Sequence, residues 1–273
     1  MSGNAPEFSG NRAVITGGTQ GLGFEVAKLL AAQGAELFLS YRSQEAKAAA
    51  AREELRALGA KRVVTGAFDL TEVTAIHAFW EEVAKFSPQI DIYIHNAAAT
   101  AFKPLLQIEP HHIDKTFNLT VKSFVMALKP LRSLMPAGGA IVTVSGMDTL
   151  RAVPLHGLLG SAKAALENLT AHAAHELGPF GIRVNGVNPG FFDSESTRKY
   201  LGPAVPLVHA AVSKQSPFRR LPELREIADV ILFLASKRSS WICGQTLKVD
   251  GGADFSMSEI NPASAGALPK GRA

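Results

Sequence analysis

Short apolar runs alternate along the chain with longer stretches that carry apolar residues at helical spacing. The runs are rich in Val, Ile, Leu and Thr, as is typical of strands that are buried on both faces of a parallel sheet. Seven of them predict strands, at residues 12–16, 35–41, 62–68, 90–96, 139–145, 182–188 and 246–251. The alternation predicts the α/β class, with one doubly wound parallel sheet and helices on both of its faces.

The stretches between these runs predict the helices. They lie at residues 22–33, 44–58, 72–86, 110–135, 155–178 and 222–236. Residues 191–214 show no clear period and are expected to form an irregular loop. We expect one domain over residues 1–252, followed by a loose C-terminal extension over residues 253–273, which is rich in Ala, Pro, Gly and Ser.

Composition narrows the functional classes. The net charge is +4, and Lys and Arg are interspersed with Asp and Glu, which predicts an ordinary solvated surface and no nucleic-acid partner. Cys243 is the single cysteine, so an intramolecular disulfide framework and a zinc site built on thiolates are both excluded. No apolar run reaches membrane-spanning length, and the first ten residues do not resemble a secretory signal. A cytoplasmic protein without a membrane partner or a metal is expected.

A glycine-rich turn follows the first predicted strand. The stretch VITGGTQGLG places Gly17, Gly21 and Gly23 between that strand and the next helix. Glycines at such a turn let the backbone approach a pyrophosphate, which the N–H groups of a helix N-terminus attract. The turn predicts dinucleotide binding, with further contacts from Thr19, Gln20 and Leu22.

The end of the second strand favours one dinucleotide over the other. An acidic residue at this point would bind the ribose 2′-hydroxyl of NAD, but the sequence there reads SYRS, with Arg42 and Ser43. A guanidinium binds phosphate oxygens in bidentate fashion. We therefore expect NADP(H), with its 2′-phosphate on Arg42 and Ser43.

Taken in order, these and later motifs resemble the short-chain dehydrogenase/reductase family, whose fold is Rossmann-like. They are TGGTQGLG, Asp69 after the third strand, HNAAA at 95–99, Asn118, Ser145, Lys163 and NPG at 188–190. The resemblance implies cofactor contacts from three further segments, at Asp69 and Leu70, at Asn96, Ala97 and Ala98, and at Pro189, Gly190 and Phe192. It also implies a catalytic set of Asn118, Ser145, a tyrosine and Lys163, which additionally binds the nicotinamide ribose.

The tyrosine of that set is missing. The family keeps it four residues before the lysine, where this chain has Leu159, and none of its three tyrosines lies on that predicted helix. Seven residues before Lys163 stands His156, on the same side of the helix because seven residues make almost two turns. HGLLGSAKAALE resembles the helix of the enoyl-acyl-carrier-protein reductases, whose tyrosine takes this earlier position. HNAAATAFKPLLQIE resembles the third type of these enzymes.

Three functions stay open at this point. The first is an NADPH-dependent reductase of a double bond conjugated to a carbonyl, in an enoyl thioester or a secondary-metabolite intermediate, where His156 donates to the developing enolate oxygen. The second is a ketoreductase or alcohol dehydrogenase that uses Ser145, Lys163 and either water or His156. The third is a dinucleotide-binding isomerase, cyclase or sensor without redox activity. The resemblance further implies a homodimer or homotetramer, and a thioester substrate could be carried by an acyl carrier protein.

Overall fold

The computed structural model describes residues 6–255, apart from the side chains of Ser196 and Lys199. Seven parallel strands form one sheet in the order β3-β2-β1-β4-β5-β6-β7. Their bounds are β1 (Arg12–Ile15), β2 (Glu36–Tyr41), β3 (Arg62–Ala67), β4 (Ile92–His95), β5 (Ala140–Val144), β6 (Arg183–Asn188) and β7 (Thr246–Lys248). The predicted class, sheet type and number of strands are confirmed.

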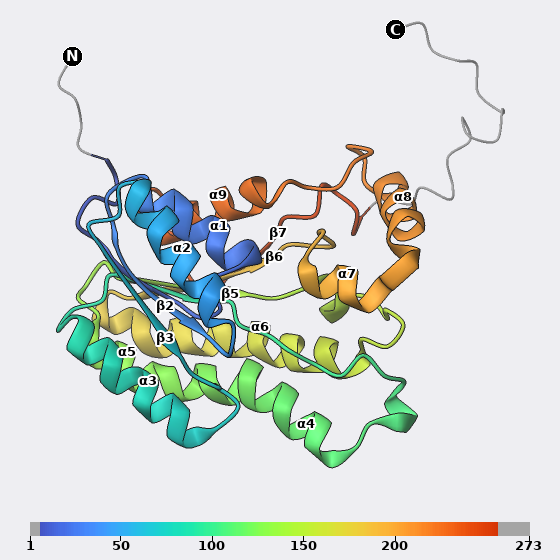
Figure 1. Ribbon diagram of the computed structural model, residues 1–273, viewed down its shortest axis with the longest axis horizontal. Coiled ribbons are helices and arrows are strands. Elements are labelled where there is room, and N and C mark those ends of the chain that lie inside the picture. The colour runs from blue at the N-terminus through green and yellow to red at the C-terminus, as the bar shows by residue number, and fades with distance from the viewer. Residues whose placement is uncertain (1–5, 256–273) are drawn as a thin grey trace, which may run out of the picture.

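Helices cover both faces of this sheet (Figure 1). One layer contains α1 (Gly21–Ala31), α2 (Glu45–Ala57) and α9 (Leu224–Ala235). The other contains α3 (Val73–Phe86), α4 (Pro110–Phe117), α5 (Ser123–Leu134) and α6 (Gly157–Leu177). Each layer buries its own apolar cluster against the sheet, with Val26 and Ile231 in the first and Phe79 and Leu131 in the second. The hydrophobic effect at these two cores fixes the strand ends that build the site.

The helix predicted over residues 110–135 is interrupted. Residues Asn118–Lys122 form a π-helical turn between α4 and α5. The pattern of hydrophobic residues in the sequence does not reveal this local change of helix type. His95, in β4, supports this turn from below: its Nε2 lies 3.1 Å from the Thr120 carbonyl oxygen and its Nδ1 3.0 Å from the Tyr93 hydroxyl. Burial and the nearby Lys163 ammonium lower the pKa of His95 to about 3, so the ring is neutral and donates through Nε2.

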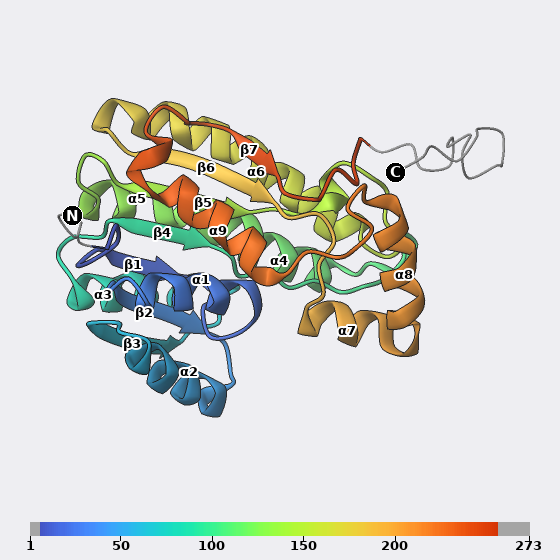
Figure 2. The same ribbon diagram turned by 90° about the horizontal axis from the view of Figure 1, so that it is seen from above.

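The expectation of an irregular loop over residues 191–214 is wrong. Two helices form there, α7 (Glu195–Leu201) and α8 (Val205–Gln215), joined by a short 3-10 turn at Gly202–Ala204. The Ser194 hydroxyl caps α7 by accepting from the Thr197 backbone N–H, 3.0 Å away. Both helices lie beyond the end of the sheet to which the strand arrows point (Figure 2). Most of the predicted extension 253–273 lies outside the described residues, so its boundary stays a prediction.

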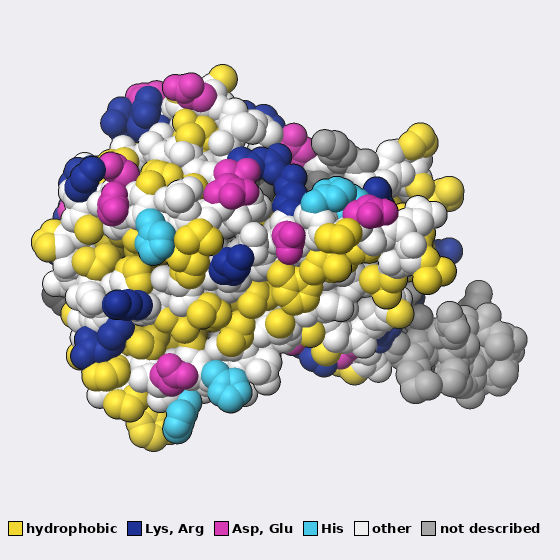
Figure 3. All heavy atoms as spheres, turned by 90° about the horizontal axis from the view of Figure 1, so that it is seen from below, with side chains coloured by type: hydrophobic (Ala, Val, Ile, Leu, Met, Phe, Trp, Pro, Cys, Tyr) yellow, Lys and Arg dark blue, Asp and Glu magenta, His cyan; other side chains and the backbone are white. Residues whose placement is uncertain are grey.

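The face of α4, α5 and α6 carries a band of hydrophobic side chains (Figure 3). Ile113 and Val125 are each 45% exposed there, and Leu106, in the 3-10 turn η1 (Leu105–Gln107), is fully exposed. Exposed apolar groups gathered on one face mark an interaction surface more often than isolated ones do. Among the described residues, no helix is both long and apolar enough to cross a membrane.

Candidate active site

A pocket of about 710 Å³ opens at the carboxyl ends of the strands and extends from the glycine turn to α7 and α8. This is the edge of an open α/β sheet where ligands bind. The predicted site residues that line it are Gly17, Thr19, Gln20, Gly21, Leu22, Arg42, Ser43, Asp69, Leu70, Asn96, Ala97, Ala98, Ser145, His156, Lys163, Gly190 and Phe192. Three others, Gly23, Asn118 and Pro189, lie outside this lining.

The glycine turn has a backbone that residues other than glycine rarely adopt. Gly17 and Gly21 have φ angles of +63° and +56°, in the left-handed region. A Cβ on Gly23 would lie 2.5 Å from the Gly17 carbonyl oxygen, so Gly23 lets α1 pack directly against the turn. The Asn96 side chain donates to the carbonyl oxygens of Thr16 and Gly17, at 3.0 and 3.2 Å, and holds the turn against β4. A tight backbone cradle at the start of α1 fits a pyrophosphate.

Two charged side chains face each other at the far end of this cradle. Arg42 is exposed at the end of β2, and Asp69 follows β3. Burial raises the pKa of Asp69, but hydrogen bonds from the Thr71 hydroxyl and backbone N–H, at 2.8 and 3.1 Å, and the charge of Arg42 lower it by more. Both bonds use Oδ1. The net lowering keeps Asp69 ionised as an acceptor, and the guanidinium offers a partner for an anion.

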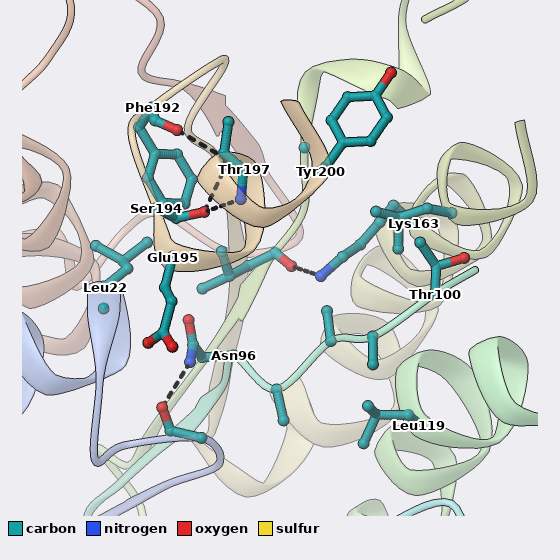
Figure 4. Close-up of a pocket in the computed structure, with 18 of the residues that line it drawn as sticks. Leu22, Asn96, Thr100, Leu119, Lys163, Phe192, Ser194, Glu195, Thr197 and Tyr200 are labelled. Carbon is teal, nitrogen blue, oxygen red and sulfur yellow. Dashed lines mark hydrogen bonds between the residues drawn. The ribbon is translucent and has the colours of Figure 1, made fainter. Parts of the chain in front are cut away.

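Lys163 lines the pocket from α6. Its side chain emerges from α6, is 5% exposed, and donates from Nζ to the Val144 carbonyl oxygen at 2.5 Å (Figure 4). Burial lowers the pKa of this ammonium to about 8, although the carboxylates of Asp148 and Glu167 raise it in part. A buried cation that titrates close to neutral pH is typical of functional sites.

His156 is the N-cap residue of α6, directly before the helix that carries Lys163. Its ring packs against the aromatic rings of Phe102 and Tyr200, each with a centroid separation of 5.0 Å, and these two rings also contact each other at 4.5 Å. Its Nδ1 lies 3.3 Å from Oδ2 of Asp148. The imidazole is therefore a polar group held at the wall of the pocket by contacts on several sides.

No phenol takes the place of the missing tyrosine in this structure. Leu159 lines the pocket at the family position. Tyr200 comes from α7, but its hydroxyl donates to the Pro154 carbonyl oxygen at 3.0 Å and points away from Lys163 (Figure 4). Tyr93 is buried on β4 against His95, and Tyr41 ends β2. His156 and Lys163 are thus the polar side chains that this segment of the chain contributes to the pocket lining.

Two of the predicted catalytic side chains are engaged within the protein. The Ser145 hydroxyl donates to Oε1 of Glu167, which also accepts from Thr149 and Asn188 at 3.0 and 3.1 Å. The Asn118 amide donates to the Thr71 carbonyl oxygen at 3.0 Å and joins the π turn to the loop after β3. Asn118 is therefore placed to support the site and not to line it.

Sequence reasoning missed Asp148 and Glu167. Glu167 follows Lys163 by four residues on one helix face, a spacing that could have marked it. Asp148 lies in a 3-10 turn, η3 (Met147–Thr149), and its proximity to His156 depends on how that turn folds. No group of three or more His, Cys, Asp or Glu side chains within residues 6–255 is arranged to hold a metal ion.

Comparison with known sequences places the chain in a large family. Residues 17–254 match the family described as enoyl-(acyl carrier protein) reductase. A 1-cyclohexenylcarbonyl-CoA reductase of Streptomyces collinus is 34% identical over 88% of this chain and 85% of its own length. The family match covers the glycine turn, strands β2 to β7 and the helices α6, α7 and α8.

Solved structures give the same result. A short-chain dehydrogenase of Burkholderia cenocepacia in complex with NADP superposes with a TM-score of 0.83 at 29% identity, covering 91% of this chain and 99% of that one. The angucycline C-6 ketoreductase LanV with bound NADP gives 0.83 at 28% identity, covering 92% and 98%. The fold, the position of the pocket at the carboxyl ends of the strands, and the sequence motifs all agree with the resemblance to the short-chain dehydrogenase/reductase family. The chain belongs to the short-chain dehydrogenase/reductase family of oxidoreductases and matches its enoyl-(acyl carrier protein) reductase type.

Proposed function

We propose that this protein is an NADPH-dependent reductase of a carbon–carbon double bond conjugated to a carbonyl group, in an enoyl thioester or a related intermediate. The observation that carries the proposal is the imidazole of His156. It lines the pocket seven residues before the buried Lys163, while Leu159 occupies the position of the family tyrosine. The similarity to a reductase named for a cyclohexenylcarbonyl thioester supports the same reaction class.

The chain offers a fitting site for NADP(H). The glycine cradle at the start of α1 would hold the pyrophosphate, Arg42 and Ser43 the 2′-phosphate, and the ionised Asp69 the amino group of adenine. Lys163 and the segment around Gly190 and Phe192 would lie at the nicotinamide end. The bound NADP in two similar structures supports this choice. When bound, the reduced cofactor supplies the hydride.

The protein's own part is to stabilise the negative charge that develops on the substrate and to supply a proton. Reduction of a conjugated double bond leaves negative charge on the carbonyl oxygen, so a hydrogen-bond donor aimed at that oxygen lowers the barrier by roughly 3–4 kcal/mol. Imidazole can donate and can transfer a proton near neutral pH, whereas leucine can do neither. The buried Lys163 ammonium adds positive charge to the same region. Leu159, Phe191 and Leu201 line the pocket with apolar groups that exclude water.

Ketone reduction is the second candidate, because LanV is a ketoreductase of similar structure. In this chain the Ser145 hydroxyl is bonded to Glu167, and the phenol that serves ketone reduction in the family is absent. These two observations favour conjugate reduction. A dinucleotide-binding protein without redox activity is the third alternative.

A panel of substrates distinguishes these three candidate functions. Purified protein is mixed with NADPH and with crotonyl-CoA, acetoacetyl-CoA or a quinone, and NADPH oxidation is followed by absorbance. We expect turnover of crotonyl-CoA alone, with deuterium from labelled NADPH found on the β-carbon of the product. His156→Ala should lower kcat by about 100-fold. His172→Ala, an exposed histidine of the same helix, serves as the matched control.

Two other results would change the assignment. Turnover of acetoacetyl-CoA alone would support the ketoreductase, and tight NADPH binding without turnover of any compound would support the inactive binding protein.

We also propose that the apolar face of α4, α5 and α6 joins copies of this chain into a homodimer or homotetramer. The exposed Ile113 and Val125 of this face support the assembly. Sedimentation of the wild type should show an oligomer that Val125→Glu dissociates. A monomer at micromolar concentration would contradict this proposal.

A further inference from the structure

Asp148 is a buried carboxylate beside the imidazole of His156. It lies in η3, directly after β5, and its side chain is only 6% exposed. Oδ2 of Asp148 is 3.3 Å from Nδ1 of His156. An ionised carboxylate can only accept hydrogen bonds, so a hydrogen bond from the ring to this carboxylate requires the proton on Nδ1. The other ring nitrogen, Nε2, is then the atom left for a ligand.

The turn that carries Asp148 is tied down on both sides. Its Thr149 hydroxyl lies 3.0 Å from Oε1 of Glu167 on α6 and 3.1 Å from the Gly146 carbonyl oxygen. Asn188, at the end of β6, donates to the same Gly146 oxygen at 2.9 Å. Hydrogen bonds from side chains of α6 and β6 therefore fix the position of η3 beside the first turn of α6.

Two glycines make room for this contact. A Cβ on Gly160 would lie 2.4 Å from the Asp148 carbonyl oxygen, and a Cβ on Gly146 would lie 2.7 Å from Oδ1 of Asp148. Such distances are well inside van der Waals contact, so any larger residue would displace η3 or the carboxylate. η3 can approach α6 this closely because glycine has no side chain at these two positions.

The imidazole also packs against two aromatic rings. The rings of Phe102 and Tyr200 pack against it, and the preceding residue, Leu155, has a φ angle of +62°. This left-handed conformation is strained for leucine and persists only where the surrounding structure imposes it, as at functional sites. Asp148 on η3 is the charged group in contact with His156, and the carboxylates of Asp148 and Glu167 both act on the Lys163 ammonium. Asp148 is thus the acidic side chain that links the imidazole to the surroundings of Lys163.

We propose that Asp148 is a positioning residue that holds His156 with Nδ1–H on the carboxylate and Nε2 directed to the substrate oxygen. The catalytic part of this inference rests on the proposed function, because it takes His156 as the donor. The carboxylate selects the tautomer and stabilises the doubly protonated ring from which Nε2 can transfer a proton, as carboxylates do for histidines in other active sites.

The tautomer is measured directly, without a substrate. In a long-range 15N–1H spectrum of protein labelled in its histidines, the His156 signals are assigned by their loss in His156→Gln. We expect the wild type to show a proton on Nδ1 and, in the neutral ring, none on Nε2. Asp148→Leu leaves Nδ1 without an acceptor, so this variant should move the proton to Nε2, while Asp229→Leu, at an exposed position on α9, should change nothing.

A wild-type ring that carries its proton on Nε2 would overturn the proposal, whether or not any variant folds. The same holds for a folded Asp148→Leu variant whose tautomer is unchanged. For turnover, we expect Asp148→Asn to lower kcat at least about tenfold with little change in KM or in NADPH affinity. If the wild type reduces no conjugated substrate, the proposed function fails, but the spectrum still decides whether Asp148 positions His156.

Discussion

The two ends of the pocket are built in different ways. At the cofactor end, the shape comes from backbone atoms: the left-handed Gly17 and Gly21, and Gly23 in contact with the Gly17 carbonyl oxygen. At the other end, which we propose to be the proton-donor end, it comes from side chains on α6, η3 and α7, which contact one another through hydrogen bonds and ring packing. A backbone cradle tolerates few changes, whereas a set of side chains can exchange one donor for another. This difference explains how the family tyrosine can be absent while the glycine turn is intact.

Gly23→Ala tests the cofactor end and should have the largest effect. The added Cβ would lie 2.5 Å from a backbone oxygen and 2.6 Å from the Asn96 amide, so α1 must move away from the turn. NADPH affinity, measured by calorimetry, should fall more than about 100-fold, or roughly 3 kcal/mol. Gly178→Ala, whose Cβ meets nothing within 4 Å, is the matched control. Equal NADPH affinity in both variants would refute the backbone argument.

Lys163→Met tests the donor end. Loss of the buried ammonium removes its charge from the pocket, and kcat for the conjugated substrate should fall by about 100-fold. Lys85→Met, at an exposed position on α3, should keep wild-type kinetics. Steady-state kinetics of both variants measures kcat, and thermal melts check that both are folded. A rate for Lys163→Met close to that of Lys85→Met would exclude Lys163 from the reaction.

Arg42→Ala sharpens the cofactor assignment. The exposed guanidinium is the proposed partner of the 2′-phosphate, so the variant should bind NADPH about tenfold more weakly and NADH with unchanged affinity. Arg56→Ala, on the exposed face of α2, is the control. If Arg42→Ala weakened NADH and NADPH equally, Arg42 would not distinguish the two cofactors.

The pH dependence of turnover tests the role of Lys163 at the donor end. Lys163 has a pKa of about 8, below its ordinary value, so the ammonium is present below pH 8 and is lost as the pH rises through it. Turnover should fall over the same range. Glu167 raises the pKa of Lys163, so Glu167→Gln should move this fall to lower pH in a kcat/KM profile. An unmoved profile would show that another group controls the alkaline limb.

Tyr200→Phe should have the smallest effect. Its hydroxyl is bonded to the Pro154 carbonyl oxygen and points away from Lys163, while its ring packs on His156. Because phenylalanine keeps the ring, kcat should change less than about twofold, as expected for loss of one partly exposed hydrogen bond outside the reaction. A loss as large as that of His156→Ala would make Tyr200 the proton donor instead.

Much of the cofactor end could be predicted from the sequence, because strands, glycines and Arg42 leave local marks. The π turn at Asn118–Lys122 could not, since one extra residue per turn does not disturb a hydrophobic pattern enough to be seen. α7 and α8 were missed because Pro203 and Pro206 interrupt a short stretch that reads as loop. Asp148 acquires its partner only when η3 folds against α6, so no sequence spacing indicated it.

A crystal structure of the protein with NADP+ and an enoyl thioester tests the central claim most directly. The account predicts that Nε2 of His156 lies within about 3 Å of the thioester carbonyl oxygen, while Nδ1 remains on Asp148. An imidazole turned away from the substrate, with that oxygen bound by other groups, would contradict it.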